Sequence, residues 1–394
     1  MQNISFVGDI MCELPQLKAS KINKYNFDKM FEEVEKYLKK SDYVIGNLET
    51  PISNFLGYTN DLYCFNTPKK FLKSLKKSHF NLLVTANNHA LDRGIIGLKQ
   101  TMKNIKKYNM DYIGTKLSKK EDNIKIKLGD TTISFYAYTY GTNYSYNKYL
   151  LKDNQKYMIN LLKDQKDINK TYKRKDFYKP LITRYIKTKI KELIKYNKPL
   201  LADKNIVIDN INDKEWKIDN KIISNIKKTI NNDKSDIKIL LLHTGGQFNK
   251  TPGTYTEEII NKIKQSNVNT IIATHPHIVQ KCTYDKKLIA YSLGNFSISP
   301  STPYLIFEDL PEYSIILNMY IENKKIIKYT FTVLKTIEDS NNYLKIYLVN
   351  ELIEKENNNE KKEKLINDLL FIYNKVLSKS LKQIDIKEEY EIGD

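Results

Sequence analysis

The sequence predicts an α/β fold with a functional site at one edge of its sheet. Two observations support this prediction. Short apolar runs alternate along the chain with segments whose apolar residues recur at helical spacing. Several of the apolar runs also end in a polar residue suited to catalysis or metal binding. In open α/β sheets, ligands bind beyond the carboxyl ends of the strands, so we expect these polar residues to meet there.

The first half of the chain alternates between expected strands and expected helices. The strands are predicted over residues 4–7, 42–46, 81–85 and 132–138, and the helices over 27–40, 68–77 and 94–108. Asp28, Glu32 and Glu33 suit the first turn of the helix over 27–40, because acidic groups are favourable near a helix N-terminus. Thr67 is expected to cap the helix over 68–77, with Pro68 at its first position.

The second half begins with a region rich in Lys, Tyr and Asn. Residues 143–235 are predicted to be a mostly helical insertion, with Pro180 and Pro199 as breakers. Strands are then expected over 237–242, 270–274 and 288–291, and residues 313–320 and 326–333 alternate like antiparallel strands. We therefore expect one domain over residues 1–336 that contains the insertion 143–235, followed by a charged helical extension over 337–394.

Composition limits the class of protein. The chain of 394 residues is 41% hydrophobic and 28% charged, which is ordinary for a globular protein. Its three cysteines have no close spacing, which excludes a disulfide framework and a cysteine zinc site. The N-terminal segment does not resemble a secretory signal, and no apolar stretch approaches the roughly 20 residues that span a bilayer. We therefore predict a cytoplasmic protein with no membrane span.

The formal net charge of +19 suggests an anionic partner, which could be nucleic acid, an anionic polymer or an acidic membrane surface. The alternative is a compositional bias of the kind found in AT-rich genomes, because Lys is spread through nearly every segment. Nucleic-acid interfaces usually concentrate their charge. We therefore favour the bias and rank a nucleic-acid partner lowest.

Four of the five histidines fall at expected strand ends, together with carboxylate and amide residues. The set that occupies this edge is Asp9, Asn47, Glu49, Asn88, His89, His243, His275 and His277. Imidazole nitrogens, carboxylates and an amide oxygen are ligands for one or two divalent ions such as Zn, Mn or Fe. Such ions promote hydrolysis, and an additional histidine can protonate the leaving group. The alternative for any single member is loop polarity or capping.

Several motifs extend this pattern. They are Gly8-Asp9, Gly46-Asn47-Leu48-Glu49-Thr50-Pro51, Phe65-Asn66-Thr67-Pro68, Ala86-Asn87-Asn88-His89-Ala90-Leu91-Asp92-Arg93-Gly94, His243, His275-Pro276-His277 and Tyr291-Ser292-Leu293-Gly294-Asn295-Phe296. In their order and identity the chain resembles the CapA-type family of poly-γ-glutamate capsule biosynthesis proteins. The fold of that family is similar to the calcineurin-like metallophosphoesterases. The resemblance implies a layered α/β/β/α sandwich with a helical insertion, and a role with an anionic polymer.

The resemblance also implies roles for individual residues. Asp9 and His277 match ligands of a first metal ion, and Asn88, His243 and His275 match ligands of a second. Asn47 stands where a bridging carboxylate would be, and Glu49 is the nearest replacement. His89 matches the histidine that protonates the leaving group, and Arg93 with Asn87 is expected to bind an anionic substrate group. Met11, Gln247 and Thr274 depart from the family pattern at other positions.

Two functions follow from this pattern. The first is a metal-dependent hydrolase of a phosphate ester or a related anionic or amide bond. Its partners would be an anionic polymer or a phosphorylated substrate, and a polymer synthase. The second is a non-catalytic component that binds the polymer through a degenerate metal site. Asp92 could be a simple helix cap and Arg93 a surface salt bridge. Asn295 could support the site from outside the ligand set or form a turn, and we favour the turn.

Overall fold

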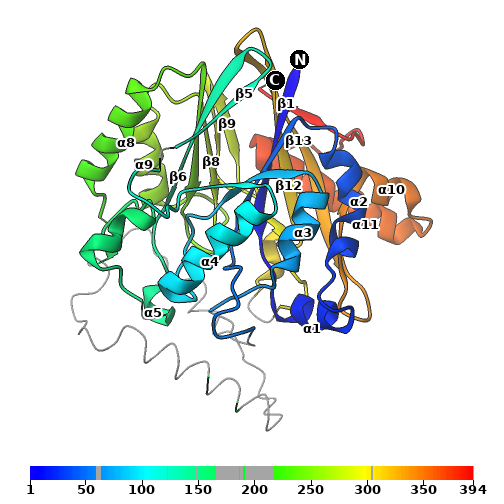
Figure 1. Cartoon of the computed structure of the whole chain (residues 1–394). Coiled ribbons are helices and arrows are strands. Elements are labelled where there is room, and N and C mark those ends of the chain that lie inside the picture. Colours follow the sequence, from blue (N-terminus) through cyan, green and yellow to red (C-terminus); the bar gives the residue numbers. More distant parts are fainter. Residues whose placement is uncertain are drawn as a thin grey trace.

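The computed structural model describes residues 1–58, 64–121, 123–147, 149–165, 217–302 and 305–393, together with Ile186 and Ile190. Two β-sheets pack face to face, and helices cover the outer face of each (Figure 1). This layered α/β/β/α arrangement confirms the predicted fold class.

The first sheet runs in the order β14-β13-β12-β1-β2-β3-β4. Its parallel half consists of β1 (Gln2–Ile10), β2 (Tyr43–Leu48), β3 (Phe80–Val84) and β4 (Asp111–Ile113). Its antiparallel half consists of β12 (Tyr313–Glu322), β13 (Lys325–Glu338) and β14 (Leu344–Leu348). The short strand β11 (Asn295–Ser297) pairs with β1, so that Asp9 lies opposite Asn295.

The second sheet runs in the order β5-β6-β7-β8-β10-β9. Its four central strands are parallel: β6 (Thr131–Thr139), β7 (Ile237–His243), β8 (Thr270–Thr274) and β10 (Lys287–Ala290). The edge strands β5 (Ile124–Leu128) and β9 (Cys282–Asp285) are antiparallel to their neighbours. The predicted strands over 132–138, 237–242, 270–274 and 288–291 therefore lie in this sheet.

Three apolar cores separate the four layers. One core joins the first sheet to α2 (Asp28–Leu38), α3 (Lys70–Lys77) and α4 (Gly94–Lys107). A second lies between the two sheets, and a third joins the second sheet to α8 (Asn220–Asn232) and α9 (Thr254–Ile263). Amphipathic helices of this kind are stabilised chiefly by burying one apolar face. The sheets are thereby fixed with the carboxyl ends of their parallel strands at a common edge.

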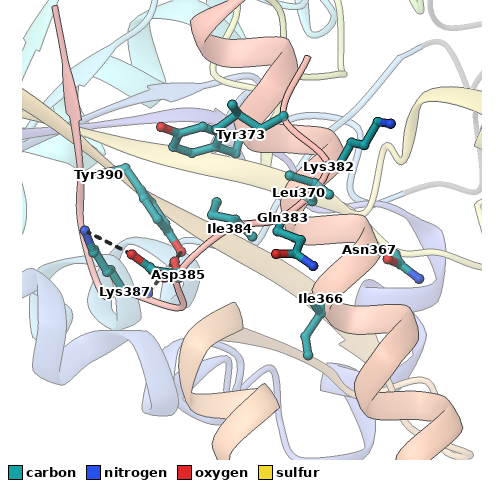
Figure 2. A pocket seen from close by; sticks show the side chains of 11 residues that line it. Ile366, Asn367, Leu370, Tyr373, Lys382, Gln383, Ile384, Asp385, Lys387 and Tyr390 are labelled. Carbon is teal, nitrogen blue, oxygen red and sulfur yellow. Dashed lines mark hydrogen bonds and ion pairs between the residues drawn. The ribbon is translucent and has the colours of Figure 1, made fainter. Parts of the chain in front are cut away.

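Several shorter or terminal elements complete the fold. α1 (Leu14–Ile22) follows β1, α5 (Tyr144–Asn147) and the 3₁₀ helix η1 (Asp153–Met158) follow β6, and the 3₁₀ helix η5 (Phe307–Asp309) precedes β12. After β14, which itself lies within the predicted extension, come α10 (Val349–Lys355) and α11 (Asn359–Leu377). The sequence analysis did not predict β15 (Tyr390–Ile392), which pairs with β13. A pocket of about 530 Å³ lies between α11 and the segment that leads to β15 (Figure 2).

Two further predictions can be compared with the structure. Thr67 does not cap the helix that follows it: α3 begins at Lys70 after Lys69, and the Thr67 hydroxyl instead lies 2.8 Å from that of Thr50. Much of the predicted insertion over 143–235 lies outside the described residues, so its helical character stays a prediction. Within the described part of the chain, none of the helices combines the length and apolar character needed to cross a membrane.

Candidate metal centre

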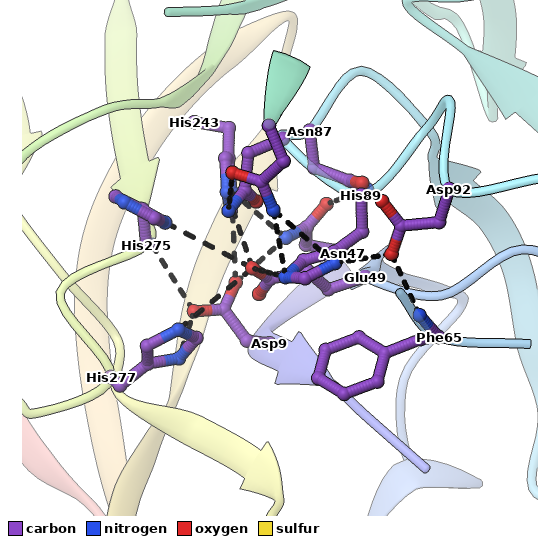
Figure 3. A network of polar contacts seen from close by, with 12 residues as sticks. Asp9, Asn47, Glu49, Phe65, Asn87, His89, Asp92, His243, His275 and His277 are labelled. Carbon is purple, nitrogen blue, oxygen red and sulfur yellow. Dashed lines mark hydrogen bonds and ion pairs between the residues drawn. The ribbon is translucent and has the colours of Figure 1, made fainter. Parts of the chain in front are cut away.

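The two sheets bring their functional residues together at the carboxyl ends of β1, β2, β7 and β8 (Figure 3). β1 approaches the strand β11 very closely here. A Cβ atom on Gly8 would lie only 1.9 Å from the carbonyl oxygen of Gly294, and Gly294 itself has a φ of +76°. Only glycine fits both positions, because a side chain would collide at the first and be strained at the second. This contact sets Asp9 beside Asn295.

Asp9 is fully buried and lies at the base of the site. Its Oδ1 accepts a hydrogen bond of 2.7 Å from the Asn47 amide, and its Oδ2 accepts one of 3.1 Å from the backbone N–H of His275. Burial alone would raise the pKa of Asp9, but its hydrogen bond and attraction to His277, with His243 and Asn47, outweigh burial and lower it. Asp9 is therefore held as a carboxylate.

Glu49 lies at the centre of the site, immediately after β2. Its Oε1 is 3.4 Å from His243 Nε2 and between 3.8 and 3.9 Å from nitrogens of the other three histidines, which are His89, His275 and His277. The side chain is fully buried, and neither carboxylate oxygen receives a hydrogen bond among the described residues. Burial and the neighbouring Asp9 carboxylate raise the pKa of Glu49 well above its usual value. A cation bound here would offset the repulsion between these two adjacent carboxylates.

His275 follows β8 and is also fully buried. Neither of its ring nitrogens has a hydrogen-bond partner among the described residues. Burial lowers the pKa of this imidazole well below its ordinary value, with the neighbouring histidines adding to the effect, so the ring is neutral and able to bind a metal ion. Its φ of +110° is strained for a residue with a side chain, and such strain concentrates at functional sites.

His243 is the last residue of β7 and is held on both ring nitrogens. Nε2 lies 2.8 Å from the side-chain oxygen of Asn88, and Nδ1 lies 3.0 Å from the hydroxyl of Thr274. Burial lowers the pKa of His243 to about 3, so it too is neutral. Its ring lies beside that of His275, with centroids 4.6 Å apart.

His277 is oriented by Asn295. The side-chain oxygen of Asn295 lies 2.9 Å from His277 Nδ1, while its amide donates a bond of 2.7 Å to the backbone carbonyl of His277. His277 Nδ1 is also 3.4 Å from Asp9 Oδ2. Asn295 therefore contacts a site imidazole from strand β11, which agrees with the less favoured of its two predicted roles.

His89 forms a dyad with Asp92, one turn further along the chain. His89 Nδ1 lies 2.6 Å from Asp92 Oδ2, and the same oxygen accepts a hydrogen bond of 2.8 Å from the backbone N–H of Phe65. The Phe65 ring packs on the imidazole with centroids 4.3 Å apart. These contacts fix the ring so that Nε2 faces Glu49 at 3.9 Å. Asp92 is therefore more than a helix cap.

The remaining predicted residues form hydrogen bonds to other groups of the protein. The Asn47 amide donates to Asp9, and the Asn47 side-chain oxygen accepts from Asn87 at 3.2 Å. Asn47 and Glu49 were both considered for the bridging position, and Glu49 is the one whose oxygens have no hydrogen-bond partner among the described residues. Asn87 also donates to the carbonyl of Leu48 at 2.8 Å. Arg93 is buried and donates to the backbone carbonyls of Cys64 and Asp92, so the suggested surface position is wrong. Metal binding by Asn47 and substrate binding by Asn87 and Arg93 stay predictions.

Two groups of side chains could hold a metal ion. Within each group the ligand atoms all lie within 4.8 Å of one another: one group is Glu49, His275 and His277, and the other is Asp9, Glu49 and His243. Because Glu49 belongs to both, its carboxylate could contact one ion or bridge two. Carboxylate and neutral imidazole suit Zn, Mn or Fe. The unsatisfied atoms of Glu49 and His275 fit a bound cation, because buried polar atoms are otherwise nearly always paired.

An apolar cluster borders the site. It consists of Met11, Phe65, Phe248, Ile278, Ile298 and Leu305. Phe65 packs on His89, and the Phe248 ring lies 5.9 Å from that of His277. Met11, which replaces an expected histidine ligand, belongs to this cluster and not to the polar site. The apolar wall limits the access of water to the imidazoles.

Sequence reasoning underestimated three residues of the site. For Asp92 and Asn295 a local structural role was weighed against a functional one, and Thr274 was noted only as a departure from the family pattern. All three contact site histidines from outside the ligand set. In the sequence, these three residues are distinguished only by lying one to eighteen residues from a histidine at a strand end. Many other residues share that property, so it could not identify them.

Comparison with known proteins agrees with the motifs. The PGA biosynthesis protein CapA of Bacillus subtilis (strain 168) is 27% identical over 301 residues, covering 74% of this chain and 62% of the relative. The capsule biosynthesis protein CapA of Bacillus anthracis is 23% identical over 299 residues, covering 74% and 59%. The chain thus spans about three fifths of the length of these curated relatives.

A solved structure of a hypothetical protein from Thermus thermophilus is similar with a TM-score of 0.43 and 10% identity, covering 85% of this chain and 99% of that one. The family described as "Bacterial capsule synthesis protein PGA_cap" matches residues 3–300, which is most of the chain. The motifs at the strand ends lie within that match. The chain therefore belongs to the bacterial capsule synthesis protein family, the CapA-type family linked to poly-γ-glutamate capsule biosynthesis.

Proposed function

We propose that this protein is a metal-dependent hydrolase that acts on an anionic polymer of the poly-γ-glutamate type, or on a phosphorylated substrate. The observation that supports this most strongly is the position of Glu49. Its buried carboxylate receives no hydrogen bond among the described residues and lies within 3.9 Å of four imidazoles. A group so costly to bury is explained by a ligand that neutralises it.

Asp9, Glu49, His243, His275 and His277 would hold one or two divalent ions. Bound there, such an ion would act as a Lewis acid on the scissile group and lower the pKa of water. Asn88 and Thr274 fix the His243 ring, and Asn295 fixes that of His277. Partners of this kind orient metal-binding imidazoles and raise their basicity.

His89 is the proposed proton donor to the leaving group. Asp92 accepts a hydrogen bond from Nδ1 and thereby leaves Nε2 facing the centre of the site. A carboxylate in this position fixes the tautomer and orientation of the imidazole. The Phe65 ring restrains the imidazole on one face.

A non-catalytic, polymer-binding role is the second candidate. The specific observation in its favour is Met11, an apolar residue in place of one expected ligand. In this case the centre would bind metal without turnover, and the protein would join a polymer synthase as an assembly component. A cytoplasmic location is a prediction under either function.

The test combines metal analysis with hydrolysis. Purified full-length protein is loaded with Mn²⁺ or Zn²⁺, its metal content is measured, and it is assayed with a chromogenic phosphomonoester, a phosphodiester and poly-γ-glutamate. The hydrolase proposal predicts bound metal and turnover of at least one substrate. His89→Asn is expected to lower kcat by about 100-fold or more with the metal retained, because general acid catalysis contributes that much.

His79→Asn is the matched control, because His79 contacts the Ser41 carbonyl at 2.9 Å and lies outside the site. Its φ of +74° is well tolerated by Asn. Activity that survives His89→Asn would remove the assigned proton donor. Bound metal without turnover of any of the three substrates would favour the non-catalytic role.

A further inference from the structure

We propose that the outer faces of α3 and α4 form a binding surface for an extended polycarboxylate. These two helices contain eight lysines: Lys70, Lys73, Lys76, Lys77, Lys99, Lys103, Lys106 and Lys107. Lys69 adds a ninth at the start of α3. All nine side chains are exposed, and neither helix contains an Asp or a Glu. We call these nine residues the lysine face.

The lysine face differs from the charged surfaces around it. The adjacent helix α2 has two lysines and four acidic residues, and α11 has four lysines and three acidic residues. α1 and α8 also lack Asp and Glu, but α8 has only three lysines in thirteen residues, whereas α3 and α4 together have eight in twenty-two. Two members of the face, Lys77 and Lys106, pair with single carboxylates of Asp28 and Asp111. Most of its charge is thus left without an ion pair among the described residues.

The position of the lysine face connects it to the candidate metal centre. α3 joins β2 to β3 and α4 joins β3 to β4, so the two helices lie side by side on one face of the first sheet (Figure 1). α3 begins just after Phe65, and α4 begins just after His89 and Asp92. A chain lying along these helices would therefore lead toward the site edge.

The chemistry of the lysine face favours carboxylates over nucleic acid or lipid. Lysine ammonium groups act as compact point charges, whereas arginine gives the bidentate contacts typical of phosphate recognition. α3 and α4 contain no arginine, and Ile96 is their one exposed large apolar residue. The two helices therefore offer no exposed aromatic ring for stacking with bases and little apolar surface to insert into a membrane. The choice of polymer rests on the proposed function, since the family is linked to poly-γ-glutamate.

The test compares two quadruple variants with equal change in net charge. In the first, Lys73, Lys76, Lys99 and Lys103 are replaced by Gln. In the second, the same replacement is made at Lys221, Lys228, Lys286 and Lys361, which are exposed but lie on other elements. Binding to poly-γ-glutamate is measured across a salt series with the full-length chain in excess EDTA. Catalysis and metal binding therefore do not enter the result, and failure of the hydrolase proposal is a separate finding.

The lysine-face variant is expected to bind poly-γ-glutamate about tenfold or more weakly, with a shallower dependence on salt, while the control stays within about twofold of wild type. Equal losses in the two variants would overturn the proposal and leave net charge as the cause. Tighter binding to duplex DNA, or to vesicles of phosphatidylserine and phosphatidylcholine, with the same loss in the lysine-face variant, would also overturn it. An absence of binding to all three probes would do so as well.

Discussion

Two polar clusters of this protein differ in how well their atoms are paired. The candidate metal centre leaves both oxygens of Glu49 and both ring nitrogens of His275 without hydrogen-bond partners among the described residues. The second cluster joins α11 to the first sheet. There Tyr313 donates to Asp368 at 2.6 Å, and Asp368 also accepts from Lys364 at 2.7 Å. Lys335 donates to the Tyr313 hydroxyl at 2.6 Å.

This difference separates a structural network from a binding site. The cluster of Tyr313, Lys335, Lys364 and Asp368 is complete in itself, so its contribution is to hold α11 on the sheet. The candidate metal centre has unpaired buried atoms among the described residues, and we expect it to lower stability unless a cation pairs them. Substitutions in the two clusters should therefore have opposite effects on stability.

The largest effect is expected for Glu49→Gln. Metal affinity should fall by more than roughly 100-fold, because Glu49 belongs to both ligand groups. Removing a residue that only orients a ligand costs up to about 100-fold. The metal-free protein should be at least as stable as wild type, since the substitution removes a buried carboxylate that lies beside Asp9. Isothermal titration with Mn²⁺ or Zn²⁺ and urea denaturation in EDTA measure the two effects. A marked fall in metal-free stability would show that Glu49 is structural.

Asp368→Ala should give the reverse result. Removing Asp368 leaves Lys335 partly buried without its carboxylate, and we expect the free energy of unfolding to fall by about 3 kcal/mol. Metal affinity of the folded protein should not change. The measurement is the same pair of titrations, with Asp385→Ala as an exposed control in the same C-terminal segment. Loss of metal binding in folded Asp368→Ala would mean that the two clusters are coupled.

Glu13 offers a test that depends on pH. Burial raises its pKa from 4.5 to about 7, despite a hydrogen bond from Thr302. Since the folded state favours the protonated form, this group's stabilisation is complete below pH 4.5 and is lost as pH rises toward 7, by roughly 3 kcal/mol in all. Glu13→Gln should therefore gain stability relative to wild type across that range. Unfolding in EDTA at several pH values checks this, and a constant difference between the two proteins would contradict it.

The smallest effect is expected for Asn295→Ala. Without the Asn295 oxygen, His277 loses the contact that orients its ring, and metal affinity should fall by about 10- to 100-fold. Asn318→Ala is the matched control, since Asn318 is a buried amide that bonds Ser5, Tyr37 and Thr330 and lies outside the site. The control should lose stability only. Equal metal affinities for the two variants would assign Asn295 a purely structural role.

The sequence predicted the edge of the sheet on which these residues lie because strand-end position is a local property. Asp9 and His243 could be placed from the apolar runs that precede them, and His275 with His277 from their spacing. Comparison with the family motif identified Glu49 only as the nearest replacement for a carboxylate missing at Asn47. Its central place depends on distances to four histidines from three other parts of the chain, which local pattern does not contain.

The outer partners were harder to predict for the same reason. Asn295 meets His277 only because β11 pairs with β1, and a three-residue strand has almost no sequence signal. The pairing of β15 with β13 across more than fifty residues is a similar case. The even distribution of Lys along the chain also concealed the lysine face, which appears only when α3 and α4 are placed side by side.

The close approach of Gly8 to Gly294 has a consequence for protein engineering. The first strand and the segment after β10 are almost three hundred residues apart, yet each occupies space that the other must leave empty. A chimera that takes its amino-terminal strand from one relative and its Leu-Gly-Asn segment from another must therefore keep both glycines. The two segments should therefore be taken together from the same parent protein.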